Sequence, residues 1–238
     1  MPRALEQWTV LPHGQLSQID ENILTVAGDL HMPLGDFPRR MSVVRLRDRS
    51  LVIYSAIALH EDEMRALEAF GRPAYLVVPS DKHRLDAKIW QDRYPELIVI
   101  APEGARDKVN EVVRVDATSV DFCDPRVQFA TVRGTNGHEC ALVVETSSGT
   151  TLIVNDLIGN VRPGHGVVGW LSRVTGVTGG EPMIPSYAKH MIVKDRRAVA
   201  QQLEEWAGLD TLRRIIVSHG MPIDERPRAT LHRLATSL

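Results

Sequence analysis

The sequence is poor in cysteine, in aromatic residues and in net charge. Its two cysteines, Cys123 and Cys140, cannot form a disulfide framework, which fits a reducing compartment. The chain has 28 lysine and arginine residues against 30 aspartate and glutamate residues, and aromatic residues make up only 5% of it. Neither a basic surface nor a set of base-stacking rings is indicated, so we expect no nucleic-acid partner.

Long apolar runs are scarce as well. The longest, residues 51–59, is too short to cross a bilayer, and residues 1–15 lack the apolar segment of a signal peptide. We therefore expect a cytoplasmic protein with no membrane partner. The sequence leaves the oligomeric state open, although Trp170, in the glycine-rich stretch GVVGWLS, is a candidate for a lid or an interface.

The chain does contain β-rich runs, in a length of 238 residues that suits one layered domain. Residues 1–20 show no clear period and are interpreted as an N-terminal arm, which leaves 21–238 as a single domain. The β-branched runs 23–28 and 41–59 predict strands, the second folded into a hairpin. The prolines and glycine of residues 31–40 predict a loop between these two runs.

Helical segments alternate with short buried strands in the rest of the chain, an order typical of an α/β layered fold with a partly parallel sheet. The first set comprises predicted helices at 60–71, 86–94 and 102–112, with strands at 74–79 and 97–102. The second set comprises strands at 127–134, 139–146 and 150–156, a helix at 196–208, a strand at 213–220 and a final helix from residue 226.

Metal-compatible side chains follow the end of one buried strand, in the segment YLVVPSDKHRLDA. Asp81 and His83 face the same side if the backbone is extended, whereas His83 and Asp86 share a face if a helix begins here. Carboxylate and imidazole groups together suit Zn, Fe or Mn. The alternative is that Asp81 or Ser80 caps the following helix and His83 is an exposed residue of its first turn.

Two later strands also end on such side chains. Asp156 closes the apolar run TTLIVND, where a buried carboxylate is costly unless it is paired or bound to a ligand. His219 ends the run RRIIVSHG, and Gly220 lets the chain turn sharply after it. Each residue alone has an ordinary explanation, a turn for Asp156 and an unpartnered strand end for His219. Functional groups of open α/β sheets gather beyond strand ends, so the three segments together favour a site.

With these segments in this order, the sequence resembles the metallo-β-lactamase fold from about Glu21 to its end. The segments VVPSDKHRLDA, YPELIVIAPEGARDKV and TTLIVNDLIGN more closely resemble an uncharacterised branch of that superfamily called DUF4336. The resemblance implies an α/β (α+β) protein, an αββα sandwich of two mixed β-sheets with helices on the outer faces. It also implies a metal site between the loops at the strand ends.

The family's usual ligand run, H-x-H-x-D-H, is missing from this chain. If the alignment is shifted by one residue, the four ligand positions are occupied by Asp81, His83, Leu85 and Asp86. In the alternative alignment without a gap, they are occupied by Ser80, Lys82, Arg84 and Leu85. A further family ligand has three candidates, His138, Thr135 and Glu139. The family's bridging aspartate matches Asp156, and its last histidine matches His219.

The expected site thus holds one divalent metal, with Zn as the first choice and Fe or Mn as alternatives. Asp86, Asp156 and His219 supply its three ligands, with His83 or His138 beside them. A small-molecule ester, lactone, thioester or amide would be hydrolysed by metal-activated water, with Asp81 as the proton acceptor. Lys82 and Arg84 would attract an anionic substrate. Two alternatives stay open: a metal-poor, non-catalytic relic of the fold that binds a ligand or partner, and iron-based redox chemistry.

Overall fold

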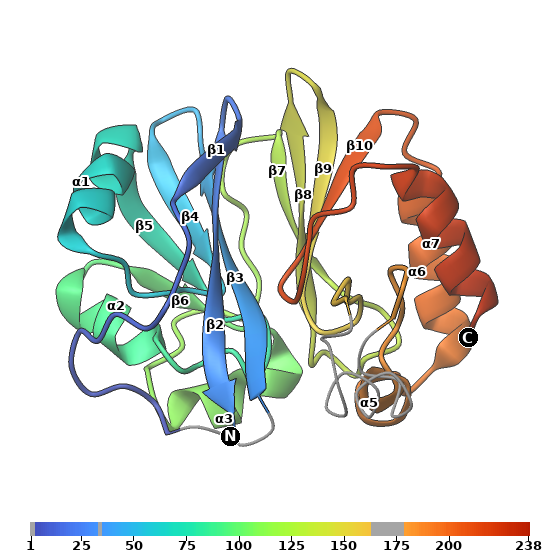
Figure 1. Ribbon diagram of the computed structural model, residues 1–238, viewed down its shortest axis with the longest axis horizontal. Helices are drawn as coiled ribbons and strands as arrows, with labels where there is room; N and C mark the ends of the chain where they lie inside the picture. The colour runs from blue at the N-terminus through green and yellow to red at the C-terminus, as the bar shows by residue number, and fades with distance from the viewer. Residues whose placement is uncertain (1–2, 33–34, 163–178) are drawn as a thin grey trace.

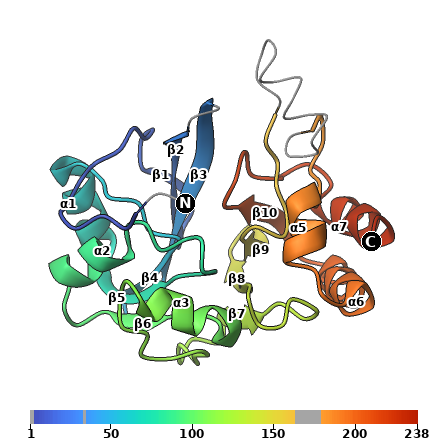
Figure 2. The ribbon, with the colours of Figure 1, turned by 90° about the horizontal axis from the view of Figure 1, so that it is seen from below.

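The computed structural model describes residues 3–32, 35–162 and 179–238. Two β-sheets pack face to face, and helices cover the outer face of each (Figure 1). Figure 2, the view from below, shows α1 and α2 on one side of the sheets and α6 and α7 on the other. The predicted αββα sandwich of two mixed sheets is confirmed.

The first sheet has six strands in sequence order, antiparallel from β1 to β4 and parallel from β4 to β6. Its strands are β1 (Ser17–Asp20), β2 (Ile23–Met32), β3 (Gly35–Arg45), β4 (Ser50–Tyr54), β5 (Arg72–Val77) and β6 (Ile98–Ile100). The parallel strands are joined by α1 (Glu61–Phe70) and α2 (Ala87–Arg93), and a 3-10 turn (Glu103–Ala105) and α3 (Arg106–Asn110) follow β6.

The second sheet has four strands in the order β10-β9-β8-β7, and only the β9–β10 pair is parallel. Its strands are β7 (Val127–Thr131), β8 (Cys140–Thr146), β9 (Gly149–Val154) and β10 (Leu212–Val217). The helices of this half are α5 (Ser186–Met191), α6 (Arg196–Ala207) and α7 (Pro227–Thr236), of which α6 and α7 lie along the outer face of the sheet (Figure 1).

Three apolar cores explain why the central strands read as continuous hydrophobic runs. In β4, Leu51 and Ile53 face the core under α1 and α2, whereas Val52 and Tyr54 face the core between the two sheets. All four side chains are buried because both faces of the strand are covered. The third core lies between the second sheet and helices α5, α6 and α7.

The loop predicted at residues 31–40 is wrong where the structure describes it, because β2 extends to Met32, β3 begins at Gly35, and the two strands are paired along this stretch. Pro38 lies on β3 opposite Asp29 of β2, and it is outside the stretch from Ser42 to Arg45 where β3 also pairs with β4. Before Ser42, β3 pairs only with β2, and proline is tolerated on the free edge of such a strand because no ladder hydrogen bond is lost there.

The N-terminal segment packs closely against the first half of the molecule. The Trp8 Nε1 donates a hydrogen bond to the Leu59 carbonyl at 3.0 Å, and its ring centroid lies 5.5 Å from that of Trp90. Residues Ser17–Asp20 form strand β1 of the six-stranded sheet. Among the described residues, no helix has the length and apolar character needed to cross a membrane.

Candidate metal centre

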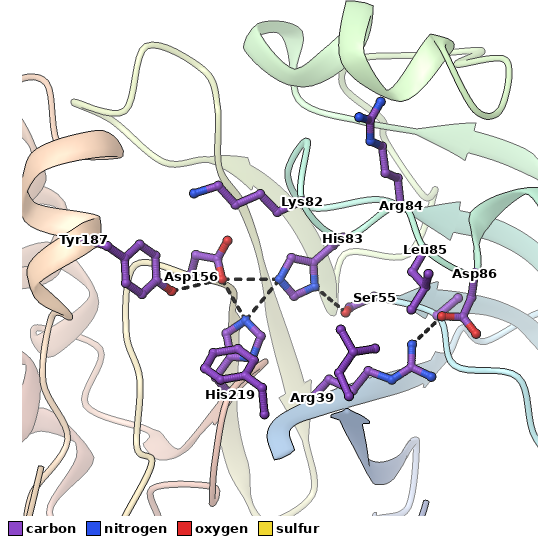
Figure 3. A pocket seen from close by; sticks show the side chains of 13 residues that line it. Arg39, Ser55, Lys82, His83, Arg84, Leu85, Asp86, Asp156, Tyr187 and His219 are labelled. Atoms are coloured by element: carbon purple, nitrogen blue, oxygen red, sulfur yellow. Dashed lines mark hydrogen bonds and ion pairs between the residues drawn. The ribbon is translucent and has the colours of Figure 1, made fainter. Parts of the chain in front are cut away.

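The three strand-end segments singled out in the sequence meet at one place between the two halves of the sandwich. His83 comes from the loop after β5, Asp156 follows β9, and His219 follows β10 (Figure 3). The Nε2 atoms of His83 and His219 are 3.2 Å apart. The Oδ1 atom of Asp156 lies 3.3 Å from the Nε2 of His83 and 2.8 Å from that of His219.

Each imidazole ring is held from behind through its second nitrogen. The Nδ1 of His219 donates to the backbone carbonyl of Pro38 at 2.8 Å, so its Nε2 lone pair faces the cluster. The Nδ1 of His83 lies 2.8 Å from the Oγ of Ser55. The hydroxyl of Tyr187 donates to the Oδ1 of Asp156 at 3.3 Å, and this completes a set of three oriented groups.

Unusual backbone conformations support two of these positions. Ser55 has a positive φ of 57°, which is uncommon for a residue with a side chain and is found at functional sites where the surroundings enforce it. Gly220 has a φ of 100°, and a Cβ there would lie 2.0 Å from the Asn160 carbonyl oxygen. The sharp turn expected after His219 is therefore present, and only glycine fits it.

The cluster is buried, and its charges depend on one another. Burial lowers the pKa of the His83 imidazole, an effect that the charge of Asp156 partly opposes. Burial by itself would raise the pKa of Asp156, but the two imidazoles outweigh it and hold this pKa well below its ordinary value. The buried Glu139 has its pKa raised well above the ordinary value by burial, with the charge of Asp156 adding to the effect. The surroundings thus shift the pKa values of these two buried carboxyls in opposite directions, that of Asp156 downwards and that of Glu139 upwards.

The structure does not bring Asp86 into this group. Its Oδ1 accepts a hydrogen bond from the Ala58 amide at 3.0 Å, and its Oδ2 is paired with the Arg39 guanidinium. Burial raises the pKa of the Asp86 carboxyl, and Arg39 partly offsets this. Both carboxylate oxygens are therefore engaged within the first half of the molecule. Among the described residues, His83, Asp156 and His219 form the cluster whose metal-ligating atoms lie within 4.8 Å of one another.

The remaining predicted residues lie at or outside the edge of the cluster. Asp81 is half-buried and is not among the residues that line the pocket, although Lys82, Arg84 and Leu85 are. Of the three candidates for the further ligand, Thr135 donates to the Val132 carbonyl at 2.7 Å, Glu139 accepts from the Asn155 side chain at 3.2 Å, and His138 is half-buried away from the pocket. Trp170 lies outside the described residues.

The pocket around the cluster combines positive charge with apolar walls. Leu30, Phe37, Ala56 and Leu85 provide apolar surface, and the Nζ of Lys82 lies 5.3 Å from the centre of the Tyr187 ring. Sequence reasoning missed Arg39, Ser55 and Tyr187. The strand-end rule that identified Asp156 applies equally to Ser55, which directly follows the buried run of β4, whereas nothing in the sequence marks Tyr187 or Arg39.

No protein-family model matches the chain, and no curated protein matches it either. Among solved structures, the metallo-β-lactamase FIM-1 from Pseudomonas aeruginosa, in a mono-zinc form, is similar at 11% identity, with 96% of each chain covered and a TM-score of 0.61. A metallo-β-lactamase from Erythrobacter litoralis is similar at 14% identity, with 94% of this chain and 96% of that chain covered and a TM-score of 0.63. The structure named VMB-1 gives a TM-score of 0.65 at 10% identity, with coverage of 96% and 99%. The chain therefore has the metallo-β-lactamase fold.

Proposed function

We propose that this protein is a hydrolase that depends on one divalent metal ion and cleaves a small ester, lactone, thioester or amide. The ligands would be His83, Asp156 and His219. The observation that carries the proposal is the triangle formed by the Oδ1 of Asp156 and the Nε2 atoms of His83 and His219. Its sides are 2.8 Å (Asp156 to His219), 3.2 Å (His219 to His83) and 3.3 Å (His83 to Asp156). Neighbouring ligand atoms of a tetrahedral zinc ion, with bonds of about 2.0–2.1 Å, lie roughly 3.3 Å apart, which this triangle matches.

The chemistry of the donor set supports the same proposal. Because the Nδ1 of His219 faces the Pro38 carbonyl, its Nε2 is the atom that faces the Asp156 carboxylate, and a cation between these two atoms, either a proton or a metal ion, satisfies both. Two imidazoles and one carboxylate suit Zn first, with Fe or Mn as alternatives. Because Asp86 is paired with Arg39, the three remaining ligands support a mono-metal site rather than a two-metal one.

The other pocket residues define what the chain contributes to the reaction. A divalent ion with three protein ligands supplies Lewis acidity and activates water near neutral pH. Burial raises the pKa of the Tyr187 hydroxyl, so it stays protonated and donates to Asp156. Lys82, in the same pocket, adds a positive charge that favours an anionic substrate. We also propose Asp81, a neighbouring carboxylate, as the proton acceptor, and a relation to the DUF4336 branch on the sequence resemblance.

A second candidate function is ligand binding without catalysis. The apolar walls of the pocket, formed by Leu30, Phe37, Ala56 and Leu85, favour it, because such surfaces bind small molecules whether or not a reaction follows. In that case, ligand affinity would not depend on metal, and His219→Ala would leave it unchanged.

The test measures metal content and hydrolysis in the same preparations. Protein purified without added metal should carry close to one equivalent of Zn, Fe or Mn and should hydrolyse at least one member of a panel of small esters, lactones, thioesters and amides. Asp156→Asn and His219→Ala should lose both properties, whereas the matched control His138→Ala should keep them. A metal content below about a tenth of an equivalent, with no stabilisation by added Zn or Mn, would overturn the proposal.

A further inference from the structure

A second group of imidazole and carboxylate side chains lies apart from the metal centre, where the N-terminal arm meets α1. His13 comes from the arm, His60 is the residue before α1, and Asp62 and Glu63 belong to the first turn of that helix. These four side chains line one shallow surface pocket, and none of them lines the pocket of the metal centre. We call this group the arm site.

The backbone holds His13 in a fixed position. The Gly14 amide donates to the Ala27 carbonyl at 2.8 Å, and the Asp29 amide donates to the Pro12 carbonyl at 2.9 Å, so the arm pairs with β2 on both sides of His13. The His13 side chain is only 3% exposed. Such a position is preorganised, because little side-chain freedom is left to be lost when a ligand binds.

The opposite side of the arm site is fixed as well. The Oε1 of Glu63 accepts a hydrogen bond from the Leu16 amide at 2.8 Å, which ties this carboxylate to the same arm. Its second oxygen, Oε2, lies 3.5 Å from the Nε2 of His13. Two potential ligand atoms, one from the arm and one from α1, therefore face each other in the folded chain.

The two ring nitrogens of His13 have different surroundings. Its Nδ1 lies 2.7 Å from the Gly14 carbonyl oxygen, which only accepts, so Nδ1 carries a proton. The Nε2 is buried and has no hydrogen-bond partner among the described residues. The Glu63 carboxylate is the charged group that faces this Nε2, and a cation between the two atoms, either a proton or a metal ion, satisfies both.

The spacing and the neighbouring charges fit a metal ion in this bridging role. Ligand atoms on a tetrahedral zinc lie roughly 3.3 Å apart, close to the 3.5 Å between the His13 Nε2 and the Glu63 Oε2. The exposed His60 has its ring centre 5.1 Å from that of His13, but its ligand atoms do not lie within 4.8 Å of those of both His13 and Glu63. A change of the His60 side-chain rotamer is therefore part of the proposal, because it brings a third ligand to the other two. Asp62 adds negative charge beside them.

We propose that the arm site binds a divalent transition metal, zinc first, through His13, Glu63 and His60. Imidazole with carboxylate is a donor set that suits this class of ion. The metal would fasten the N-terminal arm to α1. The same arm reaches the metal-centre loop, since the Leu5 amide donates to the Leu85 carbonyl at 2.9 Å, so the arm site would be a structural metal site that also steadies that loop.

The experiment uses the full chain, stripped with a chelator and dialysed against zinc alone, with bound zinc counted per protein. The wild type should bind two equivalents, His219→Ala should bind one at the arm site, and His13→Gln should bind one at the metal centre. The double variant should bind none. The matched control is His232→Gln, which alters an exposed histidine paired with Glu204 and should leave the count unchanged.

A zinc count that His13→Gln does not change, in both the wild-type and the His219→Ala background, would overturn the arm site and leave the metal centre standing. A count of one that disappears with His13→Gln but not with His219→Ala would support the arm site and contradict the proposed metal centre. If His13→Gln fails to fold, Glu63→Gln replaces it, because a glutamine Oε1 can still accept from the Leu16 amide. Zinc should also slow amide hydrogen exchange in residues 12–16 of the wild type, and an unchanged exchange rate would contradict the fastening role.

Discussion

The ion pair between Arg39 and Asp86 makes a quantitative prediction about stability. In Arg39→Met, the Asp86 carboxylate stays buried but loses its only charged partner among the described residues. The Asp86 side chain is only 1% exposed and that of Arg39 is 10% exposed, so water cannot replace the guanidinium. Removing one partner of such a buried pair costs about 3–5 kcal/mol, because an uncompensated charge is left behind.

This cost is a large part of the free energy of unfolding of an ordinary domain, about 5–15 kcal/mol. For a chain of this size, we expect the melting temperature of Arg39→Met to fall by roughly 6–20 °C. The double variant Arg39→Met/Asp86→Leu removes both charges, and apolar replacement of a whole buried pair is about neutral or even stabilising. It should therefore recover most of the loss.

The pH dependence of Arg39→Met follows from the Asp86 carboxyl. Burial raises the pKa of Asp86 in the wild type, and Arg39 opposes that shift, so the variant should have a still higher pKa. An acid with a raised folded pKa binds its proton more tightly in the folded state, so the stability it contributes is lost as pH rises through that pKa. The defect of Arg39→Met should therefore be larger at neutral pH than near about pH 4, the ordinary carboxyl range.

Urea unfolding followed by circular dichroism, at neutral and at mildly acidic pH, measures these differences. A loss below about 1 kcal/mol in Arg39→Met, or an equal loss in the double variant, would refute the view that the pair is a buried structural ion pair. Zinc counting adds an independent check. Asp86→Asn should keep the zinc of the metal centre, and loss of that zinc would show Asp86 to be a ligand.

Three further predictions concern the metal centre. Ser55→Ala removes the partner of the His83 Nδ1 and should weaken zinc affinity about 10–100-fold in a competition assay with a chelating dye, because such orienting groups typically contribute that much; an unchanged affinity would contradict the assignment. In the metal-free protein, the lowered pKa of His83 means that the unfolded chain binds the proton more tightly, so stability should fall as pH drops below the ordinary value of 6.5, and His83→Asn should flatten that part of the profile. Glu139→Gln should change the free energy of unfolding by less than about 1 kcal/mol at neutral pH, since burial raises the Glu139 pKa well above its ordinary value and so favours the uncharged form; a loss of several kcal/mol would show that its ionised form stabilises the fold.

Local sequence patterns were sufficient to predict the strands that are covered on both faces, by helices on one side and by the other sheet on the other. The runs that became β4, β5, β8 and β9 are continuous and apolar because both faces of each strand are covered, and such runs are recognisable without tertiary information. The long β2–β3 hairpin was mispredicted for the opposite reason. In its outer half, β3 pairs only with β2, and proline and glycine on its free edge carry no penalty that a sequence pattern would reveal.

The sequence by itself determined that Asp156 and His219 end buried strands, because a polar residue at the end of an apolar run is visible in one dimension. Only the tertiary structure decided between His83 and Asp86, which lie three residues apart in the same loop. His83 turns towards Asp156 and His219 from the other sheet, and Asp86 turns to Arg39 on β3. Partners from distant strands set the role of each residue, and those partners come together only when the chain folds.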